Sequence, residues 1–230
     1  MDPNRRIAVV VGLLFIIATV AALVSTQLTA STTASDYLVR VSANANEVKA
    51  GVLFELAAAG AVALIPAFLF PLLRRCHEGA ALAYLALRIL EAFVMVVGAA
   101  TSLLLVTLSQ NFVSASNPSD PSFQTTGALL QGMANWTFAL DPVIFGAGAL
   151  LLYSLLYRAL LVPPWLSLWG FGGAALVMAA GLIGMFGSFP FALAVPIAVQ
   201  ELALAGWLIV RGFTPSSIRT GAAIHPLSAI

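Results

Sequence analysis

The amino-acid sequence predicts an all-α, polytopic membrane protein built as a bundle of six transmembrane helices. Hydrophobic residues make up 61% of its 230 residues, only 8% are charged, and the mean hydropathy is +1.02. Soluble domains usually carry about 25% charged residues, so much of this surface is expected to face lipid. Six segments hold the roughly 20 apolar residues that a helix needs to cross a bilayer. They span residues 7–25, 49–72, 79–108, 126–157, 164–187 and 190–211.

The first segment follows an arginine pair and therefore resembles a secretory signal. Its apolar run from Ile7 to Val24 holds about 18 residues, more than the ~7–15 of a signal-peptide core. We therefore expect a retained first helix. The segments at 79–108 and 126–157 are longer than a bilayer requires, which predicts that they tilt or project beyond it.

Polar stretches separate these segments. Residues 26–48 and 109–125 are rich in Ser and Asn, and they predict loops that face outward. The transmembrane domain is thus expected over residues 1–212, followed by a poorly ordered cytoplasmic tail over 213–230. Three prolines are expected to interrupt and kink helix interiors, because each removes a backbone hydrogen bond. These prolines are Pro66, Pro142 and Pro196.

Arginine placement predicts the orientation of the bundle. With a cytoplasmic N-terminus, seven arginines lie on the cytoplasmic side, whereas only Arg40 and Lys49 lie on the other. This positive-inside bias predicts cytoplasmic N- and C-termini in the inner or plasma membrane of a cell. The seven arginines are Arg5, Arg6, Arg74, Arg75, Arg158, Arg211 and Arg219.

Composition argues against several classes of function. A net charge of +1 provides no basic surface for nucleic acid. Cys76 is the only cysteine, so neither an internal disulfide nor a thiolate metal site is expected. His77 and His225 lie outside the apolar segments, and the one lysine, Lys49, lies at a helix mouth. We therefore expect no metal and no cofactor.

Charged residues inside the apolar segments are the main functional signal. A rise of 1.5 Å per residue places Glu91, Glu201 and Asp141 roughly 15–24 Å from the cytoplasmic helix ends, near the middle of the bilayer. Arg88 lies one turn below Glu91 on the same helix face, and Glu55 lies nearer the outer leaflet. A charge at the bilayer centre costs at least ~2.5–3.5 kcal/mol, so these side chains are expected to face the bundle interior.

The negative charges of four ionised carboxyl groups exceed the single positive charge of one guanidinium. The excess negative charge requires a shared proton, a bound cation or water. This surplus predicts a ligand-binding site, in which Glu91, Asp141 and Glu201 are also the candidate catalytic acids. Four further residues are expected to contribute to the site. They are Gln131, Asn135, Trp136 and Gln200.

Structural roles compete with the functional interpretation. Arg88 and Glu91 could serve only to fix helix register. Glu55 could reach the outer interface. Asp141 could cap a half-helix that begins at Pro142. Four aromatic residues are interpreted as lipid-facing or core groups rather than as a binding box. They are Trp136, Phe138, Phe145 and Trp207.

Several stretches of the sequence resemble a bacterial family. They are "RRIAVVVGLLFII" near the N-terminus, "YLALRILEA" at 84–92, "LLYSLLYRALLVPPWLSLWGFGGAAL" at 151–176 and "PIAVQELALAGWLIVRGF" at 196–213. The family is known only as domain of unknown function forty-three eighty-six, and the likeness runs over nearly the whole chain. It implies a six-helix integral membrane protein and no particular activity. Where many relatives carry His or Asp before the tryptophan of the fourth helix, this chain has Asn135.

Three functions are compatible with these features. The favoured one is a site that binds or moves a proton, a cation or a small amphiphile, and six helices would suit a homodimer. The second is an intramembrane enzyme, in which a desolvated carboxylic acid protonates an isoprenoid-type lipid among aromatic side chains such as Phe93. The third is an accessory or structural subunit of a membrane complex. The expected partners are the lipid bilayer and a small-molecule or lipophilic ligand.

Overall fold

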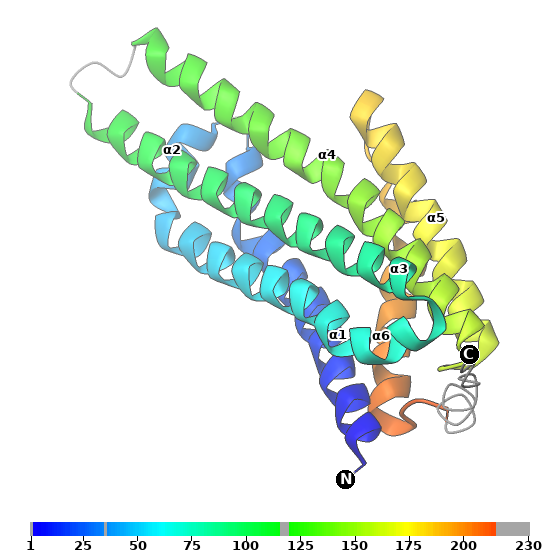
Figure 1. Cartoon of the computed structure of the whole chain (residues 1–230). Helices are drawn as coiled ribbons and strands as arrows, with labels where there is room; N and C mark the ends of the chain where they lie inside the picture. Colours follow the sequence, from blue (N-terminus) through cyan, green and yellow to red (C-terminus); the bar gives the residue numbers. More distant parts are fainter. Residues whose placement is uncertain (1, 35, 116–119, 215–230) are drawn as a thin grey trace, which may run out of the picture.

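The computed structural model confirms the all-α fold, with the helices packed side by side in one elongated bundle (Figure 1). It describes residues 2–34, 36–115 and 120–214. The α-helices are α1 (Pro3–Leu28), α2 (Tyr37–Ala43), α3 (Ala45–Ser114), α4 (Pro121–Arg158), α5 (Pro164–Phe186) and α6 (Val195–Val210), and the 3-10 helices are η1 (Ala30–Thr33) and η2 (Phe191–Leu193). Five helical segments of the described residues are long and apolar enough to cross a membrane.

Helix α3 is 70 residues long and turns back on itself at His77 (Figure 1). His77 has non-helical backbone angles, φ −161° and ψ 103°, and it separates a first arm (45–76) from an antiparallel second arm (78–114). The N–H of Ala80 donates to His77 Nδ1 at 3.1 Å, which satisfies one free donor at the start of the second arm. The two arms account for the second and third segments expected from the sequence. A bend at a single residue therefore replaces the polar linker between those segments.

Successive segments run in opposite directions through the bundle (Figure 1). Helix α3 packs against α1 and α4, α4 packs against α5, and α6 completes the bundle between α5 and α1. The main hydrophobic core joins α1, α3, α4, α5 and α6. Its largest fully buried side chains include Phe15, Tyr84 and Tyr153. Since α1 rises and α6 descends, the N-terminus and the end of α6 lie at the same end of the bundle.

The opposite end of the bundle differs from the expected loops. Helix α1 continues to Leu28, and α2 packs its Tyr37, Leu38 and Val41 against the extended ends of α3 and α4 in a second small core. A Cβ at Gly127 would clash with the Tyr37 hydroxyl, so glycine lets this ring pack against α4 as it does. The predicted loops at 26–48 and 109–125 are therefore wrong over most of their described length, because these stretches bury enough apolar surface to form helix.

Helix α4 begins at a proline that follows an acidic cap. The N–H of Ser122 donates to Asp120 Oδ1 at 2.9 Å, and this bond holds the pKa of Asp120 below its usual value. The helix then runs without interruption through Pro142. The capping role considered for Asp141 is therefore wrong, since no half-helix begins there. Pro196 also interrupts nothing, because it lies in the first turn of α6, where a missing N–H costs no helical bond.

An arginine in the first turn of α1 forms hydrogen bonds to the end of α6. Arg5 of α1 donates to the carbonyls of Leu208 at 2.9 Å, Ile209 at 2.5 Å and Val210 at 3.3 Å. These carbonyls belong to the last turn of α6, where the regular helical hydrogen bonds run out. The carbonyl of Leu208 also accepts from the N–H of Gly212 at 3.1 Å. A positive charge is also favourable at this end of the helix dipole. Gly212, with φ +75°, follows as the left-handed residue that ends the helix.

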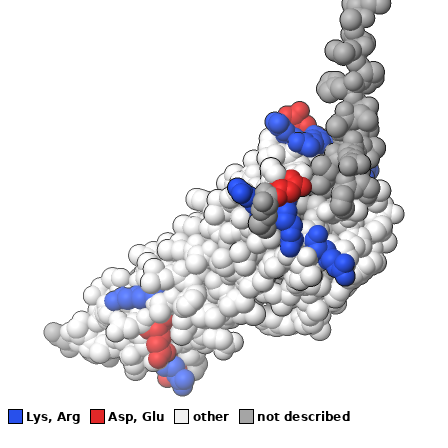
Figure 2. All heavy atoms as spheres, turned by 90° about the horizontal axis from the view of Figure 1, so that it is seen from below, with Lys and Arg blue, Asp and Glu red and all other residues white. Residues whose placement is uncertain are grey.

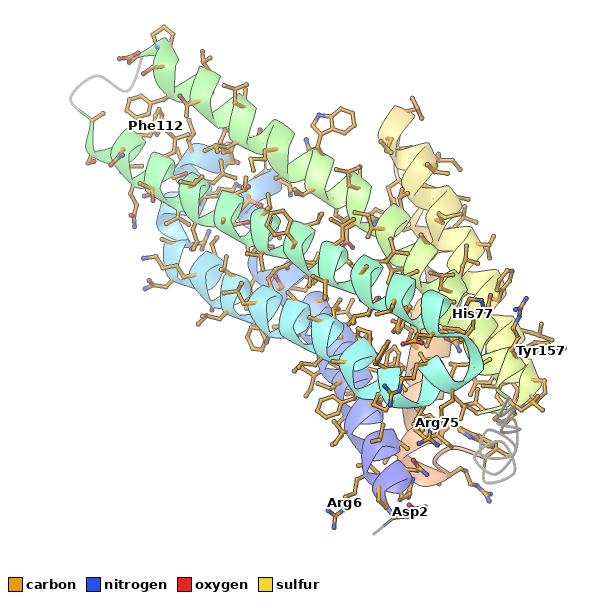
Figure 3. The ribbon with its side chains drawn as sticks, viewed as in Figure 1. Asp2, Arg6, Arg75, His77, Phe112 and Tyr157 are labelled. Atoms are coloured by element: carbon orange, nitrogen blue, oxygen red, sulfur yellow. The ribbon has the colours of Figure 1, made fainter. Side chains whose placement is uncertain are left out.

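Charged side chains on the visible face gather near the two ends of the molecule and leave an uncharged region between them (Figure 2). Figure 3 places Arg6, Arg75 and Tyr157 at the end that carries the N-terminus, and Phe112 at the opposite end. An uncharged belt of this kind is typical of a protein that lies across a membrane. Arg219 and the tail from residue 215 lie outside the described residues.

Candidate functional site

A buried ion pair lies at the centre of the candidate site. Arg88 and Glu91, both 3% exposed, face the bundle interior from one side of the second arm of α3. Arg88 Nη1 donates to Glu91 Oε2 at 2.9 Å and to Oε1 at 3.2 Å. Their spacing of three residues brings the side chains together within one turn. The pair is the one expected from the sequence.

The rest of the guanidinium is held by packing instead of hydrogen bonds. Its carbon Cζ lies 5.3 Å from the centre of the Phe145 ring on α4, within cation–π distance. The aliphatic part of Arg88 passes close to Gly148. Within the described chain, the buried Nε of Arg88 has no hydrogen-bond partner. Arg88 therefore keeps a donor free toward the interior.

Two further acids approach this pair from other helices. Asp141 of α4 and Glu201 of α6 both lie within electrostatic range of Arg88. Neither forms an ion pair with the described residues, and the Oδ1 atom of Asp141 is buried with no hydrogen-bond partner among them. Asp141 also lies within electrostatic range of Glu91 and Glu55. One cation thus faces three carboxyl groups, as the charge surplus in the sequence suggested.

Tyr84 joins the same group of residues. It is 1% exposed, lies one turn before Arg88 and is within electrostatic range of Glu91 and Glu201. Its buried hydroxyl finds no partner in the described part of the protein. We refer to Tyr84, Arg88, Glu91, Asp141 and Glu201 as the Arg88 cluster. Three helices contribute to it, and it contains donors and acceptors that have no partner among the residues the structure describes.

Beside the cluster lies a second polar group, the Gln200 network. The hydroxyl of Tyr153 on α4 donates to Gln200 Oε1 at 2.5 Å, and Gln200 Nε2 donates to the carbonyl of Leu166 on α5 at 3.0 Å. Gln200 is completely buried. A Cβ at Gly170 would lie 2.3 Å from the Tyr153 ring, so α5 needs glycine there to admit it. This network joins α4, α5 and α6 and uses both ends of the amide.

Glu55 lies apart from the cluster, on the first arm of α3. Its Oε2 atom accepts a hydrogen bond of 2.7 Å from the hydroxyl of Ser25 on α1. Ser25 is 1% exposed, and Glu55 is half-buried. The sequence left open whether Glu55 reaches the outer interface. Its carboxyl group contacts the buried Ser25 and lies within electrostatic range of Asp141.

Three residues expected at the site do not join the cluster. Gln131 donates to the carbonyl of Thr32 at 3.1 Å, near the far end of the bundle. Asn135 is exposed, and Trp136 is 56% exposed on the outer surface of α4. Phe93, considered for an aromatic pocket, is 63% exposed as well. Hydropathy alone did not reveal which face of the fourth segment turns outward.

Sequence reasoning did not include Tyr84, Tyr153 or Ser25 among the site residues, and it favoured a lipid-facing or core role for Phe145. Tyr84 had a usable signal, because a spacing of four residues puts it on the same helix face as Arg88. The others have no such signal, since their contacts depend on how separate helices align. No three His, Cys, Asp or Glu side chains of the described residues converge closely enough to hold a metal ion.

The fold and the site define an all-helical protein with several apolar helices, compatible with a membrane protein, and a buried polar cluster among them. Residues 10–212 match the family described as Domain of unknown function (DUF4386), and the chain belongs to that family. No curated protein and no solved structure matches the chain. The family resemblance noted in the sequence is therefore confirmed.

Proposed function

We propose that this chain is a multi-pass membrane protein that binds and moves protons at the Arg88 cluster. The observation that carries the proposal is the uneven pairing of charge. Arg88 forms its ion pair with Glu91, while Asp141 and Glu201 lie within its electrostatic range without one. Carboxylates that are desolvated and unpaired inside a membrane are expensive, and taking up a proton removes that cost.

The chemistry of the cluster favours a proton over a metal ion. The fixed charge of Arg88 repels a second cation, whereas a proton on Glu201 becomes part of a neutral carboxylic acid. The described carboxyl groups also do not converge into a ligand set for a metal. A carboxyl group binds a proton on one oxygen and needs no such convergence.

The proposal includes an orientation. Six arginines of the described residues lie in the end segments that we assign to the cytoplasm, whereas Arg40 lies in α2 and Lys49 near the start of α3, at the other end. The positive-inside rule then assigns both the N-terminus and the end of α6 to the cytoplasmic side of a cell membrane. Glu201 lies nearer that side than Asp141 or Glu55.

The test is proton flux into liposomes that contain the purified protein and an enclosed pH-sensitive dye. A potassium diffusion potential, set by valinomycin, supplies the driving force. We expect wild-type flux above that of empty liposomes, and Glu201→Gln should lower it at least about 100-fold, the lower range for removing an acid–base group. Glu78→Gln, at the exposed bend of α3, is the matched control and should conduct normally.

Two results would contradict the proposal. One is wild-type protein that passes no more protons than empty liposomes. The other is Glu201→Gln protein that folds and conducts as the wild type does. In the second case, the Arg88–Glu91 pair would be a device for helix register, which is the structural role considered from the sequence.

A further inference from the structure

The acids of the bundle lie at successive heights along it. The second arm of α3 and α4 run antiparallel, and two contacts fix their register. A Cβ at Gly98 would lie 3.5 Å from Thr137 Oγ1, and a Cβ at Gly148 would lie 3.5 Å from Arg88 Cδ. Asp141 falls between these two contacts. It therefore stands above the Arg88–Glu91 pair, on the side away from the His77 bend.

Glu55 stands higher again. Ala59 and Val62 of the first arm share a small core with Ala92 of the second arm, which fixes the register between the arms. Glu55 lies one turn beyond Ala59, farther from the bend. This height puts it above Asp141, and the two carboxyl groups lie within electrostatic range of each other.

Glu201 marks the lower end of the series. Its neighbour Gln200 binds Tyr153, which lies 12 residues along α4 from Asp141 toward the bend, a helix rise of roughly 18 Å. Between these heights lie Arg88 and Tyr84, each within electrostatic range of Glu201. From Glu55 to Glu201 the acids cover roughly 24 Å of helix rise, most of the ~30 Å of a bilayer core.

We propose that these residues form one proton relay, with Glu55 as its port on the side away from the start of α1 and the end of α6, and Glu201 as its port on the side where these two helix ends lie. The inference rests on the proposed function and adds a route to it. In each step one O–H bond breaks on the donor as another forms on the acceptor, so nothing is oxidised or reduced. Ser25 holds the port by donating its hydroxyl hydrogen to one oxygen of Glu55, which leaves the other oxygen for the moving proton.

The intervals between the acids contain suitable polar partners. No hydrogen bond joins the acids directly within the described ranges, so each transfer needs an intermediate donor or acceptor. Tyr84 Oη, Arg88 Nε and Asp141 Oδ1 are buried along the route and have no partner among the described residues. A buried water molecule typically makes about three hydrogen bonds to such groups. Water molecules held by these atoms complete the relay.

The experiment compares Glu55→Gln with Glu47→Gln in the liposome flux assay. Glu47 is exposed two turns away on the same arm and should have no role. We expect Glu55→Gln to lower flux at least about tenfold, Glu55→Asp to regain part of it, and Glu47→Gln to match the wild type. Infrared spectra of the protein in detergent identify the carboxylic-acid band of Glu201 as the one that Glu201→Gln removes. This band should remain in Glu55→Gln, because only the port is removed.

The outcomes separate the two proposals. If Glu55→Gln conducts normally while Glu201→Gln does not, Glu55 is no port and the relay is overturned, whereas the proposed function stands. If Glu55→Gln and Glu55→Asp both fail to conduct and Glu55→Gln also loses the Glu201 band, Glu55 acts through the structure and the relay is again overturned. If the wild type carries no protons, both proposals fall.

Discussion

Two polar groups lie next to each other in the bundle, and they differ in how completely they are satisfied. In the Gln200 network, the amide both accepts and donates, and its partners come from α4 and α5. In the Arg88 cluster, one ion pair is complete, yet the Arg88 Nε, the Tyr84 hydroxyl and the Asp141 Oδ1 have no partner among the described residues. Both groups are buried, so burial does not explain the difference.

The contrast indicates how to separate a polar group that holds helices together from one that handles a ligand. A network in which each polar group has a hydrogen-bond partner gains no further stabilisation from a bound ligand. A cluster with unused donors and acceptors carries an unfavourable desolvation free energy, which a bound ligand or a proton can relieve. We therefore assign the Gln200 network a structural role and regard the Arg88 cluster as the candidate functional site.

The strongest way to test this contrast is to remove the one cation of the cluster. Arg88→Met leaves Glu91 buried and uncompensated, so we expect the free energy of unfolding to fall by about 3–5 kcal/mol. Adding Glu91→Leu should recover most of that loss, because both charges are then gone. Unfolding in mixed micelles measures both variants. An Arg88→Met protein as stable as the wild type would mean that Glu91 has another partner.

A smaller effect is expected in the Gln200 network. Gln200→Leu leaves the Tyr153 hydroxyl without its acceptor and removes the donor to Leu166, which should cost about 1–3 kcal/mol of unfolding free energy. Proton flux per folded molecule should stay within about twofold of the wild type, since we assign the network no part in transfer. Loss of flux in a stable Gln200→Leu protein would erase the distinction between the two groups.

The smallest expected change in stability is that of Glu201→Gln. The carboxyl group of Glu201 makes no hydrogen bond within the described chain, so the amide breaks none and should alter the unfolding free energy by less than the roughly 1–3 kcal/mol expected at Gln200. Stability and function thus respond oppositely at adjacent positions, Gln200 and Glu201. A loss of stability at Glu201 as large as that at Gln200 would indicate that the carboxyl group has a structural role instead.

Much of the fold could be predicted because a helix able to cross a membrane needs a long apolar run. Apolar runs of about 20 residues identify the long helices, and the His77 bend falls in the one short polar stretch between 49–72 and 79–108. Helix α2 was not predicted because it is only seven residues long and therefore offers few turns of periodic pattern. Its folding depends on covering α3 and α4, which hydropathy does not report.

The site was predictable to the extent that it is local. Arg88 and Glu91 meet because they are three residues apart on one helix, so their spacing predicts the pair. The bond between Ser25 and Glu55 joins residues 30 apart, and the one between Tyr153 and Gln200 joins residues 47 apart. Such contacts depend on the rotation and register of separate helices. Close packing at glycines sets this alignment, and the amino-acid composition does not reveal it.

The contact between Arg5 and α6 has a consequence for how the chain is made. Arg5 and its carbonyl partners at 208–210 lie 203 to 205 residues apart in the sequence. Because a ribosome makes a chain from its N-terminal side, Arg5 is made long before these partners and stays without them until α6 has been synthesised. Fixing α1 to α6 is therefore a late event in the assembly of the bundle.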